Sequence, residues 1–163
     1  MDHQLLTFGG GLLLATAVFG ASCSTAPSTV PSPAQDVDHR GAVFVDVDGV
    51  DHTLDRATVF VFWQPWCAAC REEAPAAVAA SAAMAGEVAF VGVVSGPDEA
   101  VDQALFEKSV DELGLSYPQV RDRDLSLTKR FDVRATPTVV VVGGDGHVRY
   151  RGSKLPSDWA LPR

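Results

Sequence analysis

Short apolar segments alternate with helical segments along the middle of this chain. The apolar segments are rich in β-branched and aromatic residues, which favour β-strands. We therefore predict strands at residues 42–47, 50–54, 58–62, 88–94, 139–142 and 147–150. The stretches between them contain good helix formers or apolar residues at helical spacing. They predict helices at residues 67–83 and 100–113, and a short helix or helical turn at 122–131.

Turn signals separate these elements. Asp48-Gly49 and the glycine-rich run at 143–146 are typical of tight turns between paired strands. Gly114 fits the end of the second helix, and Pro75 lies inside the first, where we expect a kink. Strands that alternate with helices and are followed by a closing hairpin predict an α/β fold, with a mixed central sheet and helices on both faces.

The chain begins with an apolar stretch that ends in small residues before a cysteine. Residues 5–21 are almost continuously apolar, and Cys23 follows directly after Gly20-Ala21-Ser22. This pattern resembles a bacterial lipoprotein signal, in which residues 1–22 are removed and Cys23 becomes lipidated. Because no Lys or Arg precedes the stretch, ordinary cleavage and an uncleaved anchor stay open as alternatives. All three versions export the rest of the chain.

The composition after Cys23 is that of a tether. Residues 24–34 are almost wholly Ser, Thr, Pro and Ala, and such a segment cannot bury a core. We assign residues 23–40 to the lipidated cysteine and its tether, and residues 41–163 to one folded domain.

The formal charge of −8, without a basic cluster, argues against nucleic acid as a partner.

Two cysteines stand where a buried strand gives way to a helix. Cys67 lies at or just before the first helical turn, and Cys70 lies one turn further on. The unpaired N–H groups and the partial positive charge of a helix start favour a thiolate, so the pKa of Cys67 should be lowered. A thiolate attacks disulfides, and Cys70 can then resolve the mixed disulfide. Such a pair is itself the redox group, so no cofactor is required.

Two other interpretations of the cysteine pair are possible. C-x-x-C is also half of a zinc site, but the other half would have to come from Cys23 and four scattered histidines, so we expect no metal. A purely structural disulfide is the second alternative, although a bond across so short a loop restricts the unfolded chain little. If Cys23 is lipidated, an exported chain keeps only the C-x-x-C pair free to oxidise.

These motifs, taken in order along the chain, resemble the thioredoxin fold. The residues that carry the resemblance are Phe62-Trp63, residues 66–71, Pro75 and Thr136-Pro137-Thr138. The segment at 96–133 resembles the insertion of the exported thiol-disulfide oxidoreductases of the TlpA, ResA and DsbE group. The likeness covers about residues 41–151. It implies a thioredoxin-like sheet with an N-terminal hairpin and a helical insertion before the cis-proline strand.

The resemblance also implies roles for individual residues. Pro137 would follow a cis peptide bond and lie beside the C-x-x-C pair. The backbone of Thr136 would pair with an extended substrate segment. Trp66 would flank the nucleophile, and Trp63 would support the strand from the core.

A proton acceptor for the resolving cysteine is a further expectation. Thioredoxin carries a buried acid on its central strand, whereas Val61 stands at that position here. In the ResA-like branch a glutamate plays a comparable part, and Asp98 or Glu99 of the insertion could match it. The alternative is that both are solvated loop acids. Glu72 and Glu73, near the helix start, are expected on a solvated face.

Together these features predict an exported, membrane-tethered thiol-disulfide oxidoreductase of the bacterial cell envelope. Its partners would be exported protein thiols or disulfides and a membrane electron-transfer partner, and we expect a monomer. The direction of electron transfer stays open. The protein would keep exported thiols reduced, for example in cytochrome c maturation, or it would insert disulfides. The neutral Ala68-Ala69 pair between the cysteines favours neither direction.

Two functions of other classes remain as alternatives. A copper-binding or copper-delivery protein on the same fold would need a remote histidine, for which His147 or His52 is available. C-x-x-C spacing suits such a site less well than C-x-x-x-C. A non-catalytic lipoprotein would keep the fold only to bind a partner.

Overall fold

The computed structural model describes residues 37–159 of the chain. The predicted signal, the lipidation site at Cys23 and most of the tether lie outside the described residues. The described part consists of a central sheet, a separate hairpin and three helices. None of these helices is long and apolar enough to cross a membrane.

A five-stranded sheet forms the centre of the described domain. Its strands are β3 (Thr58–Trp63), β4 (Ala89–Ser95), β5 (Gln119–Asp122), β6 (Thr138–Val142) and β7 (Val148–Gly152). They lie in the order β5-β4-β3-β6-β7. β3 is parallel to β4 and antiparallel to β6, while β4 is parallel to β5 and β6 antiparallel to β7. The prediction of a mixed sheet is confirmed.

Two helices cover one face of this sheet. α1 (Ala68–Ala83) and α2 (Gln103–Leu113) pack against side chains of β3 that point to this face, among them Val59 and Trp63. Every residue of β3 is buried. The uninterrupted apolar run of this strand follows from its cover on both faces.

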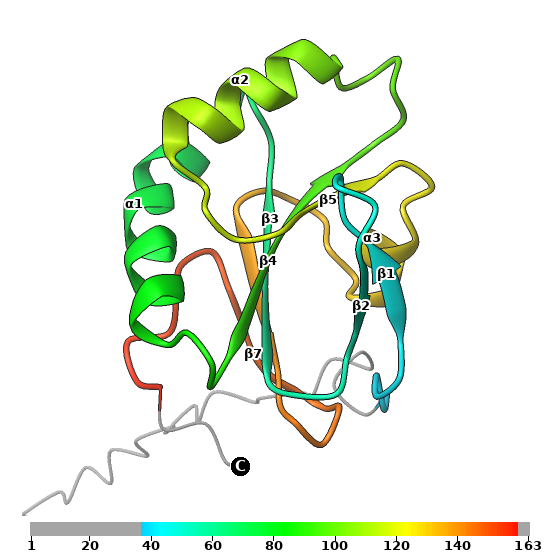
Figure 1. Cartoon of the computed structure of the whole chain (residues 1–163), viewed down its shortest axis with the longest axis vertical. Coiled ribbons are helices and arrows are strands. Elements are labelled where there is room, and N and C mark those ends of the chain that lie inside the picture. Colours follow the sequence, from blue (N-terminus) through cyan, green and yellow to red (C-terminus); the bar gives the residue numbers. More distant parts are fainter. Residues whose placement is uncertain (1–36, 160–163) are drawn as a thin grey trace, which may run out of the picture. The chain divides into compact units, whose positions relative to one another are not determined.

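A shorter helix and a hairpin cover the other face. α3 (Ser126–Arg130) and the hairpin of β1 (Val43–Val45) and β2 (Asp51–Thr53) pack here, against Phe60 and Phe62 of β3. Figure 1 shows α1 and α2 on one side of the sheet, and α3 with the hairpin on the other. Helices on both faces were predicted, and this arrangement is confirmed.

Two element boundaries agree closely with the sequence pattern. α1 runs through Pro75 and ends at Ala83, as predicted. Gly114 ends α2 in the left-handed conformation, with φ 61°, which a glycine adopts without a steric penalty. The helix itself starts at Gln103 rather than at residue 100, because Oδ1 of Asp102 accepts a hydrogen bond from the N–H of Leu105 at 2.8 Å and caps the first turn.

Other elements differ from the prediction. β5 was not predicted, because three of its four residues are polar and give no apolar run. Asp122 is the last residue of this strand, so the short helix predicted to begin there starts only at Ser126. The strands of the hairpin are three residues each, shorter than predicted.

The segment after β7 packs against the core without forming a helix among the described residues. Residues 153–159 contain no helix. Leu155 and Trp159 pack against the core beneath α1 and α2, where the Trp159 ring lies 6.1 Å from that of Phe90. The hydroxyl of Tyr150 donates a hydrogen bond to the carbonyl of Lys154 at 2.8 Å. These contacts hold the segment on the α1 face of the sheet.

Candidate active site

The two cysteines lie where β3 passes into α1. Cys67 is the N-cap of α1, and its Sγ accepts a hydrogen bond from the N–H of Cys70 at 3.1 Å. The two sulfurs form a disulfide, with their Cα atoms 5.2 Å apart. Cys67 is partly exposed, whereas Cys70 is only 5% exposed. An incoming partner therefore reaches Cys67 first.

The start of α1 also favours a reactive state of Cys67. The first turn of α1 contains no acidic residue, so within this turn no carboxylate opposes the positive end of the helix dipole. In the reduced pair, this end of the helix stabilises a thiolate on Cys67 more than one on Cys70. Position and exposure thus favour Cys67 over Cys70 as the nucleophile, and this role stays a prediction.

Two tryptophans flank the turn in different ways. Trp66 is 58% exposed directly before Cys67 and offers an apolar surface beside this partly exposed cysteine. Trp63 is buried at the end of β3, and its Nε1 donates a hydrogen bond to Oε1 of Gln119 at 3.0 Å. The core position expected for Trp63 is confirmed, while the contact of Trp66 with a substrate stays a prediction.

Pro137 lies close to the buried cysteine. The Thr136–Pro137 peptide bond is cis, as the resemblance implies. Pro137 and Cys70 line the same narrow, mostly apolar cavity. Its volume of about 20 Å³ leaves space for roughly one water molecule. Thr136 lies half-buried in the loop before β6, and its pairing with a substrate stays a prediction.

An acid that the sequence analysis placed on a solvated face lines this cavity. Glu73 lies one helical turn beyond Cys70 and forms part of the cavity wall. Its Oε1 is 3.0 Å from Nζ of Lys154, and its side chain is only 24% exposed. The hydrogen bond that Lys154 donates to this carboxylate raises the pKa of Lys154. The three-residue spacing from Cys70, which puts both on one helix face, was the signal available in the sequence.

The acids predicted to serve Cys70 lie elsewhere. Oδ1 of Asp98 accepts a hydrogen bond from Nε of Arg123 at 2.7 Å and lies 3.4 Å from Nη2 of Arg121. Neither Asp98 nor Glu99 is among the residues that line the cavity beside Cys70. The geometry therefore favours Glu73 over both as proton acceptor.

The two histidines available for a copper site, His52 and His147, do not lie beside the cysteines. On the hairpin, Nε2 of His52 lies 2.7 Å from Oδ2 of Asp46, and His147 lies in the turn before β7. Neither lines the cavity beside Cys70. Among residues 37–159, no group of three or more His, Cys, Asp or Glu side chains is arranged to hold a metal ion.

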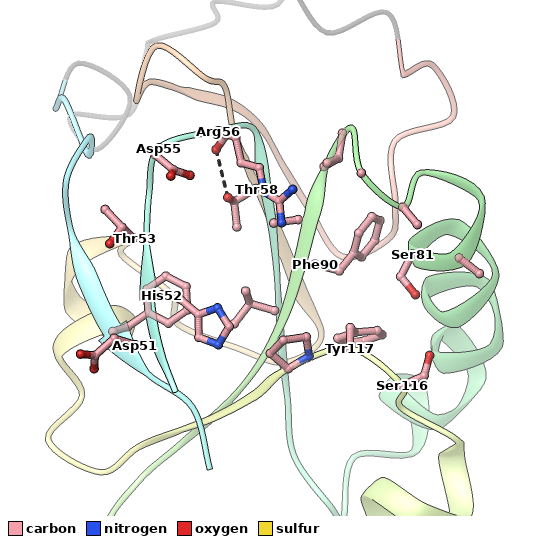
Figure 2. A pocket seen from close by; sticks show the side chains of 18 residues that line it. Asp51, His52, Thr53, Asp55, Arg56, Thr58, Ser81, Phe90, Ser116 and Tyr117 are labelled. Atoms are coloured by element: carbon pink, nitrogen blue, oxygen red, sulfur yellow. Dashed lines mark hydrogen bonds between the residues drawn. The ribbon is translucent and has the colours of Figure 1, made fainter. Parts of the chain in front are cut away.

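A hollow of about 640 Å³ lies near the start of β3, at the opposite end of this strand from the cysteines. Figure 2 shows His52 and Thr53 of β2 on one side of it, and Ser81 of α1 with Tyr117 on the other. Its lining contains no cysteine. This hollow therefore has no part in the redox site.

Comparison with known proteins agrees with the geometry of the site. A family model described as Redoxin matches residues 29–157. This chain belongs to the Redoxin family. The match includes both cysteines and the Thr136-Pro137 loop, and therefore every residue assigned above to the redox site.

Among curated proteins, this Redoxin-family chain is similar to the soluble secreted antigen MPT53 of Mycobacterium tuberculosis and Mycobacterium bovis. The identity is 31% over 91 residues, which is 56% of this chain and 50% of the relative. The chain thus spans about half the length of the curated relatives it matches.

Solved structures show the same fold. One is a secreted Mycobacterium tuberculosis disulfide oxidoreductase homologous to E. coli DsbE, with 25% identity, coverage of 72% of this chain and 85% of that chain, and a TM-score of 0.59. A second is Mycobacterium tuberculosis DsbF in mixed oxidized and reduced forms, with 28% identity, coverage of 76% and 90%, and a TM-score of 0.61. StoA from Bacillus subtilis, at 23% identity, coverage of 70% and 89%, and a TM-score of 0.59, shares the fold. The thioredoxin-like fold implied by the sequence resemblance is confirmed.

Proposed function

We propose that this protein is an exported thiol-disulfide oxidoreductase that exchanges disulfides with client proteins through Cys67 and Cys70. One observation carries the proposal: the cysteines are joined in a disulfide in which Cys67 caps a helix and is partly exposed, while Cys70 is buried. The secreted and disulfide-oxidoreductase relatives support both the activity and the export.

The exchange proceeds in two steps when the reduced protein meets a client disulfide. The Cys67 thiolate attacks one client sulfur, a mixed disulfide forms, and the other client sulfur leaves as a thiolate. Cys70 then loses its proton and attacks the Cys67 sulfur. The Cys67–Cys70 disulfide forms, and the second client thiolate leaves. Two electrons have passed from the pair to the client, and the reverse sequence oxidises a client dithiol.

Glu73 is the group that takes the proton from Cys70. It lines the cavity that contains Cys70, and Lys154 Nζ lies 3.0 Å from its Oε1. A positioned base contributes roughly 10²–10⁴-fold to such a step. The cavity is small and mostly apolar, so the proton passes from Cys70 to Glu73 directly or through one water.

The proposal also covers where the protein is located in the cell and which proteins it acts on. The sequence pattern around Cys23 supports a lipid anchor in the cell envelope, and the clients are then exported proteins with reactive thiols or disulfides. If this protein is a reductant, it would serve thiols such as the haem-binding cysteines of cytochrome c maturation. It would then draw electrons from a membrane partner. An oxidant would serve newly exported proteins.

The reduction potential of the pair tests the proposal and decides its direction. The oxidised protein is equilibrated in a series of glutathione buffers, and the reduced fraction is counted by alkylation of thiols. A potential of roughly −120 to −180 mV indicates an oxidant or isomerase, and roughly −250 mV or lower indicates a reductant. A pair that no thiol buffer reduces while the protein stays folded is a structural disulfide, and this result would refute the proposal.

A further inference from the structure

Arg151 carries a guanidinium group that has no hydrogen-bond partner within residues 37–159. Its Nε, Nη1 and Nη2 atoms are all buried and unsatisfied. The residue lies on β7, opposite Val140 of β6. Burial lowers the pKa of Arg151, and the charge of Asp132 acts in the opposite direction. A buried charged donor without an acceptor is costly, and such a group in a native fold calls for an explanation.

Arg151 lines a hollow that adjoins the redox site. The hollow has a volume of about 400 Å³ and lies between the loop before β6 and the end of β7. Pro137 lines this hollow and also the cavity that contains Cys70. Pro137 is therefore a wall residue that the hollow shares with the cysteine cavity.

The ionisable residues of the hollow leave one positive charge unbalanced. Its lining contains two arginines and one aspartate. Asp132 is already engaged by Arg134, with Nε to Oδ1 at 3.1 Å and Nη2 to Oδ2 at 3.3 Å. Arg151 is the cation that remains, although the whole chain has a formal charge of −8. The hollow thus favours a group of negative charge.

We propose that this hollow receives an acidic side chain of the client while a nearby client cysteine reacts with Cys67. The Arg151 nitrogens, buried in the free protein, turn toward the hollow when the client binds, and the client carboxylate accepts hydrogen bonds from them. The inference rests on the proposed function and names a substrate class, extended segments with an acidic residue close to the reactive cysteine. A client strand that pairs with the backbone at Thr136 would run past Pro137 and over the hollow. A planar carboxylate matches the fork of donors on a guanidinium.

Matched peptides test this proposal with the full-length protein. Each peptide carries one cysteine in a mixed disulfide with glutathione, and a single Glu is placed in turn at each of the three positions before and after it. The partner peptide has Gln at the same position. Rate constants for reduction are measured with the reduced wild type, Arg151→Gln and Arg149→Gln. Arg149 serves as the control because it is an exposed arginine on the same strand.

The proposal expects a Glu peptide to react about tenfold faster than its Gln partner at one or two adjacent positions, a ratio that corresponds to ~1.4 kcal/mol. Arg151→Gln should bring this ratio to about 1 and keep the rate on Gln peptides, whereas Arg149→Gln should leave the ratio unchanged. Arg151→Lys, which keeps the charge but not the fork, should retain part of the preference.

Several results would overturn the proposal. One is an equal rate for Glu and Gln peptides at every position in the wild type, and another is a preference that survives Arg151→Gln. A third is an Arg151→Gln variant that melts earlier and slows all peptides alike, which would make Arg151 purely structural. Loss of the preference in millimolar acetate would mark a site for free anions instead. If no peptide reacts with the wild type, the proposed function itself fails.

Discussion

The carboxylate of Glu73 lies 3.0 Å from the ammonium group of Lys154. The two residues come from distant parts of the chain, Glu73 from α1 and Lys154 from the segment after β7. Glu73 also forms part of the wall of the cavity that contains Cys70. The C-terminal segment therefore supplies the cation that pairs with an acid in the wall of this cavity.

Replacing Glu73 by Gln should slow the resolving step. Without a carboxylate, Cys70 has no positioned acceptor for its proton, and a loss of roughly 100-fold is expected in the rate at which it displaces a client from Cys67. Single-turnover mixing with a client disulfide separates this step from the first attack, which should keep its rate. Glu72→Gln is the control, since Glu72 is exposed on the same turn. Equal effects of the two substitutions would argue against a specific role for Glu73.

Replacing Asp46 by Asn should lower the stability of the hairpin end of the domain. Oδ1 of Asp46 accepts hydrogen bonds from the N–H groups of Asp48 and Val50, both at 2.9 Å, and Oδ2 lies 2.7 Å from Nε2 of His52. Burial pushes the pKa of Asp46 upward, but these bonds outweigh it and the pKa is lowered. A free energy of unfolding lower by about 1–3 kcal/mol is expected at neutral pH.

The sign of this pH dependence follows from the lowered pKa. The folded state holds the Asp46 proton less tightly than the unfolded state, so the stabilisation is present above the ordinary value of 3.8 and is lost as the pH falls through the folded pKa. Urea unfolding of the wild type and Asp46→Asn should therefore converge on acidification. Asp48→Asn, on the exposed turn, is the control. A difference that stays constant down to roughly pH 3 would contradict this account.

Replacing Gly92 by Ala should destabilise the core next to the redox site. A Cβ atom on Gly92 would overlap the side-chain amide of Gln119. That amide is fixed on both sides, because it accepts from Nε1 of Trp63 at 3.0 Å and donates to the carbonyl of Tyr117 at 2.9 Å. A loss of about 1–3 kcal/mol in the free energy of unfolding is expected.

A double-mutant cycle checks the origin of that loss. In a Gln119→Ala background the overlap is absent, so the further cost of Gly92→Ala should fall to a fraction of its wild-type value. Gly144→Ala is the matched control, because its Cβ would meet only the N atom of Ala57 at 3.8 Å. Fully additive costs at residues 92 and 119 would show that the overlap is not the cause.

The sequence predicts those parts of the fold that depend on local signals. The buried run of β3, the helix start at Cys67 and the glycine after α2 each follow from a few neighbouring residues. β5 does not, because its residues are mostly polar and are buried through hydrogen bonds that form only in the folded chain. Gln119 is held by Trp63, and Asp122 accepts hydrogen bonds from N–H groups at the start of α3.

The same distinction applies to the site. Motifs in the sequence identify Cys67, Cys70 and Pro137. The residues around Glu73, in contrast, predict an acid on the solvent-exposed face of a helix. Its place in the cavity depends on Lys154 and on the packing of the C-terminal segment, neither of which a local pattern contains. The unsatisfied nitrogens of Arg151 are likewise a property of the packed chain alone.

Trapping of the mixed disulfide tests most directly that Cys67 is the nucleophile and Cys70 the resolving cysteine. Reduced Cys70→Ser and Cys67→Ser variants are mixed with a disulfide-bonded client peptide, and the products are resolved by mass spectrometry. The account predicts that Cys70→Ser accumulates a one-to-one adduct through Cys67, while Cys67→Ser forms almost none because Cys70 is buried. Rapid adduct formation at Cys70 in Cys67→Ser, with none at Cys67 in Cys70→Ser, would contradict it.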